Sequence, residues 1–274
     1  MAKEREKAGQ EVTLFAPLTS VERLMRAIPS IAGLSIHDFE TRTSVGRIRS
    51  GLPDAVEWLG RLPSLEPFDT VICDNLPEIL ELRSDAIISA HFFWHEAVQG
   101  SAKSYVDYCI KLLKRHQPLV LGCELFSMDS VRSQPGFIPV GLYKIPELVI
   151  AAKERPLDQR TDLLVTGGTT PSLRKQLQEV IRDLIRKGPH PYKYVRVDPE
   201  LMPDKPPAWM VAADFSVEMY CSLKASICRP GLGVLTDLLT VGATIYPVFE
   251  DGNSEMKSNA LCLATLQQLP NGVS

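Results

Sequence analysis

Short apolar runs alternate with amphipathic stretches along almost the whole chain. In the second half, apolar runs at 162–165, 192–197, 225–228 and 244–248 predict buried strands. Stretches with helical periodicity at 171–187, 215–223, 232–241 and 254–267 predict helices between and after them. Strands that are apolar throughout and alternate with helices are typical of a parallel sheet covered on both faces. This half is therefore predicted to be a doubly wound α/β domain.

The first half shows the same alternation less regularly. Apolar runs at 11–16, 69–73, 86–90 and 119–122 predict strands, and helices are expected at 20–28, from Pro77 and at 101–116. Between 135 and 159 the alternation is lost and four prolines occur, which we interpret as a crossover between domains. The prediction is two doubly wound, Rossmann-like parallel-sheet domains facing a cleft, over residues 1–145 and 160–274.

Composition and charge exclude several classes of protein. The 274 residues are 45% hydrophobic and 23% charged, as in globular proteins, and the net charge of −3 argues against a general nucleic-acid binder. The six cysteines form no Cys-x-x-Cys pair, so we expect reduced thiols and no bound metal. The charged first residues and the absence of a membrane-length apolar run lead us to expect a cytoplasmic protein without a transmembrane segment.

Three loops of the second half carry the candidate chemistry, because ligands of doubly wound sheets bind beyond the carboxyl ends of the strands. The first loop follows the strand at 162–165 and contains Gly167, Gly168, Thr169 and Thr170. Glycines let the backbone approach a ligand closely, and the N-terminus of the next helix offers free N–H groups to phosphate. An ordinary tight turn is the alternative for this loop taken alone.

The second loop follows the strand at 225–228 and contains Arg229, Gly231 and Gly233 at the start of another helix. A guanidinium there can pair with a diphosphate. Asp237, further along the same helix, can accept hydrogen bonds from ribose hydroxyls.

The third loop is rich in carboxylates and amides that suit the hydroxyl groups of a sugar. Its candidates are Glu250, Asp251, Asn253, Glu255 and Asn259. A solvated acidic loop is the alternative reading. Since all three loops follow strands of one predicted sheet, we expect them to form a single nucleotide-sugar site.

An ordered set of residues in this half resembles the donor-binding segment of the GT-B glycosyltransferases. The set runs Arg229-x-Gly231, Asp237, Gly242, Pro247, Glu250-Asp251 and Asn259-Ala260. It is most similar to the group that contains the cell-wall lipid-intermediate N-acetylglucosaminyltransferase and the nucleotide-sugar hydrolase of pseudaminic acid synthesis. The sequence departs from the family pattern at Val234, where the family has Thr, and at Asp237, where it has Glu.

The first half resembles the same family more loosely. Residues 1–17 resemble its first helix and second strand, so the first strand and a Gly-x-Gly-His loop, which supplies a catalytic histidine in the hydrolase, have no counterpart. We therefore expect the first strand of the N-terminal domain to be missing. Candidates for the base that deprotonates the nucleophile are Asp74, His91 and His95. A structural role is the alternative for each histidine.

The resemblance implies a hexosyltransferase-type glycosyltransferase that takes its sugar from a nucleotide-sugar donor, expected to be UDP-linked, and needs no cofactor. An unidentified acceptor would attack the anomeric carbon while a helix dipole and Arg229 stabilise the departing diphosphate. Two alternatives stay open. One is a nucleotide-sugar hydrolase, and the other is a catalytically weak nucleotide-sugar-binding protein or subunit that lacks the N-terminal loop.

Overall fold

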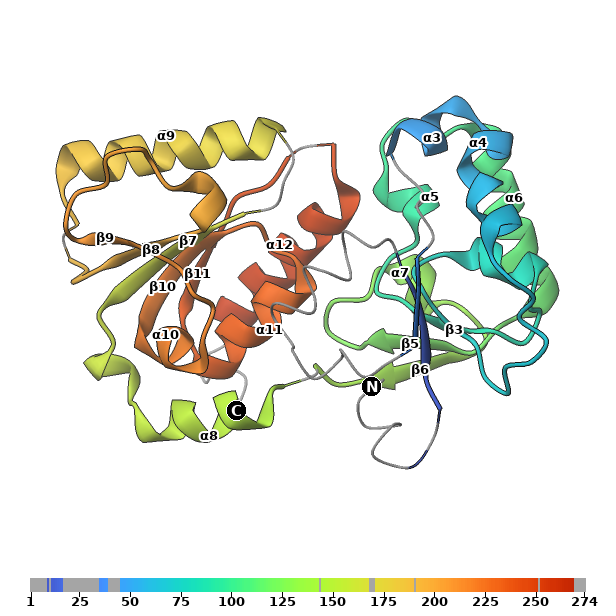
Figure 1. The fold of residues 1–274 in the computed structure, drawn as a ribbon, viewed down its shortest axis with the longest axis horizontal. Helices are drawn as coiled ribbons and strands as arrows, with labels where there is room; N and C mark the ends of the chain where they lie inside the picture. Colours follow the sequence, from blue (N-terminus) through green and yellow to red (C-terminus); the bar gives the residue numbers. More distant parts are fainter. Residues whose placement is uncertain are drawn as a thin grey trace. The chain divides into compact units, whose positions relative to one another are not determined.

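The computed structural model describes residues 9, 11–16, 35–38, 45–142, 144–167, 171–189, 191–250 and 252–268. The chain divides into two compact units (Figure 1). The first comprises the described parts of Met1–Leu121 and Ser133–Ile138, and the second those of Gly122–Arg132 and Pro139–Ser274. No described helix combines the length and the apolar character needed to span a bilayer.

A five-stranded sheet forms the centre of the second unit, and its order is β11-β10-β7-β8-β9. The strands are β7 (Asp162–Thr166), β8 (Val195–Val197), β9 (Met210–Ala212), β10 (Leu223–Cys228) and β11 (Thr244–Pro247). All four neighbouring pairs are parallel. The chain starts in the middle at β7, adds β8 and β9 on one side, and then adds β10 and β11 on the other. The order therefore reverses between β7 and β10.

Helices cover both faces of this sheet. They are α8 (Pro146–Glu154), α9 (Pro171–Lys187), α10 (Val217–Ser222), α11 (Leu232–Val241) and α12 (Ser254–Gln268). On one face, Leu173 and Leu177 of α9 pack in a core with Leu163 and Val165 of β7. The intervening Leu164 belongs to the core of the other face, with residues of α11 and α12. This alternation along β7 is the period of two expected of a strand buried on both sides.

The ends of two predicted helices are confirmed. Helix α9 covers the predicted range 171–187, and α11 covers 232–241 and ends at Gly242, whose φ of 71° is the left-handed conformation that glycine adopts without strain. The elements that were not predicted include β9, and the strand β6 (Phe137–Val140) and helix α8 inside the expected crossover. Helix α8 starts with Pro146, which the first turn of a helix accepts, and Leu148 is its one buried residue, so its apolar periodicity is weak.

The first unit carries the sheet order β3-β4-β5-β6 and a separate parallel pair, β1-β2. The remaining strands are β1 (Thr13–Ala16), β2 (Ser35–Asp38), β3 (Ile72–Asp74), β4 (Ile87–Ser89) and β5 (Val120–Cys123). Its helices are α3 (Val45–Ser50), α4 (Leu52–Val56), α5 (Trp94–Ala97) and α6 (Lys103–His116), with 3-10 turns η2 (Glu57–Arg61) and η3 (Pro77–Glu81). Helix α6 buries Tyr105, Cys109, Leu112 and Leu113, as its spacing predicts. The helix predicted at 20–28 lies outside the described residues.

Shorter elements complete the described chain: helix α7 (Asp129–Arg132) and the 3-10 turns η4 (Leu157–Gln159) and η5 (Pro199–Leu201). All six cysteines are free, four of them buried and two partly buried.

Candidate functional site

The carboxyl ends of β7, β10 and β11 lie side by side in the second unit. Cys228 at the end of β10 is in register with Thr166 at the end of β7 and with Pro247 at the end of β11. The three predicted loops start from these positions. In an open α/β sheet, a ligand binds beyond the carboxyl ends of the strands where the strand order reverses, and that reversal lies between β7 and β10.

Hydrogen bonds connect the first residues of these loops. The Arg229 amide donates to the Thr166 carbonyl at 3.3 Å, and the Val248 amide donates to the Cys228 carbonyl at 2.9 Å. The hydroxyl of Ser172, in the first turn of α9, donates to the carboxylate of Glu250. The first turn of α9 and the start of the acidic loop are thus brought together. Ser172 is not among the predicted site residues. Its position directly after Pro171, where the predicted helix starts, could have indicated that it lies beside the site.

The predicted glycines differ in how much space a side chain would find at their positions. A Cβ at Gly167 would lie 2.1 Å from the Leu177 Cδ1 atom, so this position lets α9 approach β7 closely. A Cβ at Gly231 would lie 3.7 Å from the Nη1 atom of Arg229, whose guanidinium is therefore close to this turn. Nothing lies within 4 Å of the corresponding point at Gly233. The site candidates Gly168, Thr169, Thr170 and Asp251 fall outside the described residues.

The guanidinium of Arg229 has no carboxylate within 4.0 Å among the described residues, so its charge is not neutralised by an ion pair there. It lies beside the N-terminus of α11, whose helix cap is Gly231. A cation next to free helix N–H groups is an arrangement suited to a phosphate or diphosphate.

Asn259 of α12 lies beneath the Arg229 turn rather than at the surface. It is fully buried, and its Nδ2 donates to the Pro230 carbonyl at 2.9 Å. Its Oδ1 is buried without a hydrogen-bond partner among the described residues. The side chain therefore fixes the shape of the turn that carries Arg229.

The other predicted polar residues are used partly for structure. Asn253 Oδ1 accepts from the Met256 amide at 3.1 Å and so caps α12, and Glu255 in the first turn of that helix is buried. Asp237 is hydrogen-bonded to the Tyr220 hydroxyl, and burial raises the pKa of its carboxyl. The Tyr220 hydroxyl therefore occupies part of the Asp237 carboxylate.

The three candidate bases lie in the first unit and differ in exposure. Asp74 ends β3, is exposed, and accepts from Asn75 Nδ2 at 3.0 Å. His91 follows β4 and is half-buried, with its ring edge-on to Phe92. His95 in α5 is buried, its ring stacks on Phe93, and burial lowers its pKa to about 4. Of the two histidines, His91 is therefore the one that reaches solvent.

A metal site is not apparent in the part of the chain that the structure describes, since no three His, Cys, Asp or Glu side chains come together there to hold an ion.

Comparison with solved structures identifies the fold. The calicheamicin glycosyltransferase CalG4 is 13% identical with a TM-score of 0.56, and 97% of this chain aligns with 79% of that protein. MurG of Acinetobacter baumannii is 16% identical with a TM-score of 0.54, covering 97% of this chain and 78% of that one. The fold is that of the GT-B glycosyltransferases.

A third GT-B structure, glycosyltransferase SsfS6 of Streptomyces sp. SF2575, was solved with thymidine diphosphate. It is 15% identical with a TM-score of 0.53, and 97% of this chain aligns with 80% of it. No family model and no curated protein matches the sequence. The predicted fold class, α/β with parallel sheets of GT-B type, is confirmed, and at these identities the likeness is one of fold.

Proposed function

We propose that this protein is a glycosyltransferase that transfers a sugar from a nucleoside-diphosphate donor to an acceptor hydroxyl. The observation that carries the proposal is that β7, β10 and β11 end side by side where the strand order of the second unit reverses, so that the three loops start from one edge of the sheet. They contribute an arginine that has no ion pair among the described residues, the N-termini of α9 and α11, and a carboxylate bound by Ser172.

In this proposal each group of the second unit has a separate role. Arg229 and the N-terminal N–H groups of α11 bind the diphosphate, and Gly231 and Gly233 leave room for its close approach. Glu250 accepts hydrogen bonds from sugar hydroxyls, while Asn259 keeps the Arg229 turn in place. Asp237 binds the ribose, with Tyr220 sharing its carboxylate.

The proposed reaction needs only the groups of the chain and its two substrates. The acceptor oxygen forms a bond to the anomeric carbon, and the bond from that carbon to the diphosphate breaks, with its electron pair leaving on the diphosphate. Arg229 and the helix dipole stabilise the charge that develops there. The acceptor proton passes to a base, for which Asp74 and His91 are the solvent-accessible candidates.

A thermal-shift screen over nucleoside diphosphates tests the donor proposal. A ligand that binds only the folded protein at about 100 times its Kd stabilises it by about 2.7 kcal/mol, so UDP or thymidine diphosphate should raise Tm in a concentration-dependent way. Arg229→Ala should remove that rise, whereas Arg186→Ala on the exposed end of α9 should preserve it. No rise at millimolar nucleotide with the wild-type protein would contradict the proposal.

Product analysis then separates transfer from hydrolysis. If the matching nucleotide sugar is converted to free sugar at the same rate with and without candidate acceptors, the protein is a hydrolase. Binding without turnover under all conditions would indicate a nucleotide-sugar-binding subunit.

A further inference from the structure

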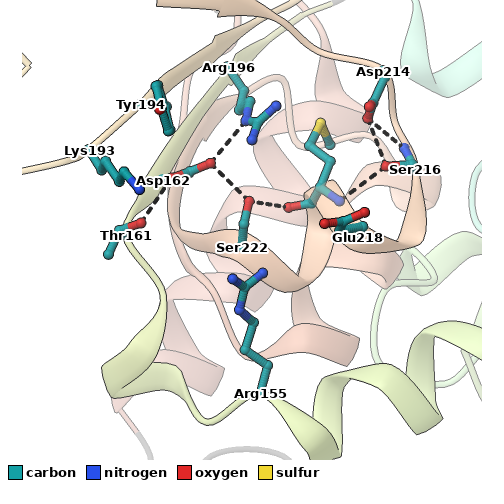
Figure 2. Close-up of a pocket in the computed structure, with 11 residues that line it drawn as sticks. Arg155, Thr161, Asp162, Lys193, Tyr194, Arg196, Asp214, Ser216, Glu218 and Ser222 are labelled. Carbon is teal, nitrogen blue, oxygen red and sulfur yellow. Dashed lines mark hydrogen bonds and ion pairs between the residues drawn. The ribbon is translucent and has the colours of Figure 1, made fainter. Parts of the chain in front are cut away.

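A concave site lies at the edge of this sheet that is opposite to the donor loops (Figure 2). This pocket, which we call the amino-edge pocket, has a volume of about 300 Å³. It is lined where β7 and β8 begin, at Thr161, Asp162 and Lys193, and at the start of α10. Arg155 reaches it from the end of α8.

A buried carboxylate organises the floor of the amino-edge pocket. The side chain of Asp162 is 3% exposed, and its Oδ2 accepts from Arg196 Nε at 2.9 Å and from Ser222 Oγ at 3.0 Å. The other oxygen, Oδ1, accepts from the Thr161 hydroxyl at 3.0 Å. Asp162 therefore accepts three hydrogen bonds from protein donors, and its charge is paired with that of Arg196.

Two further cations line the pocket without an acidic partner. Neither Arg155 nor Lys193 has a carboxylate within 4.0 Å among the described residues, and the Nη groups of Arg196 make no hydrogen bond there. Lys193 and Arg196 both lie near the ring of Tyr194, at 5.3 and 5.7 Å from its centroid. Arginine and lysine donors converging on one cavity are suited to a phosphate or carboxylate group.

Two acidic residues, Asp214 and Glu218, also line the pocket and restrict the kinds of ligand that it can bind. Asp214 accepts from the amide and the hydroxyl of Ser216, at 3.0 and 2.9 Å, and is thus used within its own loop. Glu218 makes no hydrogen bond or ion pair among the described residues. A ligand that reaches both sides would present a hydroxyl or amino group to Glu218. A cavity of this size lies at the lower end of ligand pockets, which hold about 300–1,000 Å³.

We propose that the amino-edge pocket binds a small oxyanion, a phosphate or carboxylate compound whose charged group is held by Arg155, Lys193 and Arg196. This site is separate from the proposed donor site, because β7 and β10 begin at the pocket and end at the donor loops. A ligand can therefore occupy it while the donor loops are free, and the proposal does not depend on the donor proposal.

Amide NMR on the full chain tests this proposal with inorganic phosphate as the probe, titrated at constant ionic strength and followed by citrate as a carboxylate probe. We expect saturable shifts at Thr161, Lys193 and Ser222 with at least one of the two anions. Shifts at Gly231 and Gly233 report separately on the donor loops, so the two sites are distinguished in one spectrum.

Two variants of exposed residues make the test specific. Arg155→Gln should weaken anion binding in the pocket by roughly 10- to 100-fold, as the loss of a charge-assisted hydrogen bond implies. Glu218→Gln should strengthen it severalfold by removing a like charge. Arg182→Gln on the exposed face of α9 is the matched control and should change nothing.

Three results would overturn the proposal. The shifts could rise linearly without saturation for both anions, or they could be confined to the donor loops. In the third case, Arg155→Gln would leave the affinity measured at Thr161 and Ser222 unchanged. Saturable shifts with phosphate alone or with citrate alone would support the proposal and identify which oxyanion the pocket prefers.

Discussion

Replacing Glu78 by glutamine tests the electrostatics of the first unit. Glu78 lies in η3 and is fully buried, and its Oε1 accepts from the hydroxyl of the buried Tyr105 at 2.6 Å. Its Oε2 has no hydrogen-bond partner among the described residues. Burial raises the pKa of this carboxyl from 4.5 to about 7, despite the opposing effect of the Tyr105 hydrogen bond.

The sign of the pH dependence follows from proton binding. Between pH 4.5 and about 7 the folded protein holds a proton on Glu78 that the unfolded chain releases. The stability from this group is therefore fully present below pH 4.5 and is lost as the pH rises to about 7. That interval corresponds to about 3 kcal/mol, since one pH unit is worth about 1.4 kcal/mol.

Glutamine does not ionise, so Glu78→Gln should lose the pH dependence that this carboxyl contributes. Relative to wild type, we expect the variant to gain about 2–3 kcal/mol of unfolding free energy between pH 5 and pH 8. Burying the glutamine amide carries a cost that does not depend on pH. This cost lowers the unfolding free energy of the variant equally at pH 5 and pH 8 and leaves the difference between them unchanged. His95 titrates in both proteins, so its contribution cancels in the difference.

Urea unfolding measures this difference if the signal comes from the first unit alone. Trp58 and Trp94 lie in that unit and Trp209 in the second, so a Trp209→Phe background isolates the signal. Glu81→Gln is the matched control, since Glu81 lies in the same turn but is exposed. Parallel pH profiles for wild type and Glu78→Gln would refute the reasoning.

Three further predictions concern packing, the Arg229 turn and a buried histidine. Gly167→Ala should cost about 1–3 kcal/mol in urea unfolding, because its Cβ would overlap α9, whereas Gly233→Ala, with open space around it, should cost nothing. Asn259→Ala removes the bond to the Pro230 carbonyl and should cost about 1–3 kcal/mol and weaken nucleotide binding; an unchanged Kd by calorimetry would remove it from the site. NMR titration of His95 should show a neutral ring above about pH 5, because burial lowers its pKa to about 4, and the stability it contributes should be lost as the pH falls from 6.5 towards that value.

The sequence predicts the elements of the second unit well where the hydrophobic pattern is long or where a glycine marks the end of a helix. Helix α9 has seventeen residues of clear periodicity, and α11 ends at a glycine in the left-handed conformation. The strand β9 has three residues, too few for a period of two to emerge from a loop. Helix α8 buries one residue, so its periodicity gave no signal. Short or weakly buried elements are defined by tertiary packing rather than by their own pattern.

The candidate site could also be predicted only in part from the sequence. The sequence predicts that the three loops start from one edge of the sheet, because parallel neighbouring strands end at the same edge. The order of strands and loops does not show which side chains bind one another. Asp237 pairs with Tyr220 of α10, and Glu250 pairs with Ser172 of α9, 78 residues earlier in the sequence. The amino-edge pocket was missed for the same reason, since its cations come from segments that share no local motif.

The central claim is that the three loops of the second unit hold one diphosphate, and amide NMR with UDP or thymidine diphosphate tests it most directly. We predict that Gly167, Gly231, Gly233 and Asn253 shift together and saturate with a single Kd, and that Arg229→Ala weakens that Kd by roughly 10- to 100-fold. Shifts in only one of the loops, or different Kd values for different loops, would contradict the account.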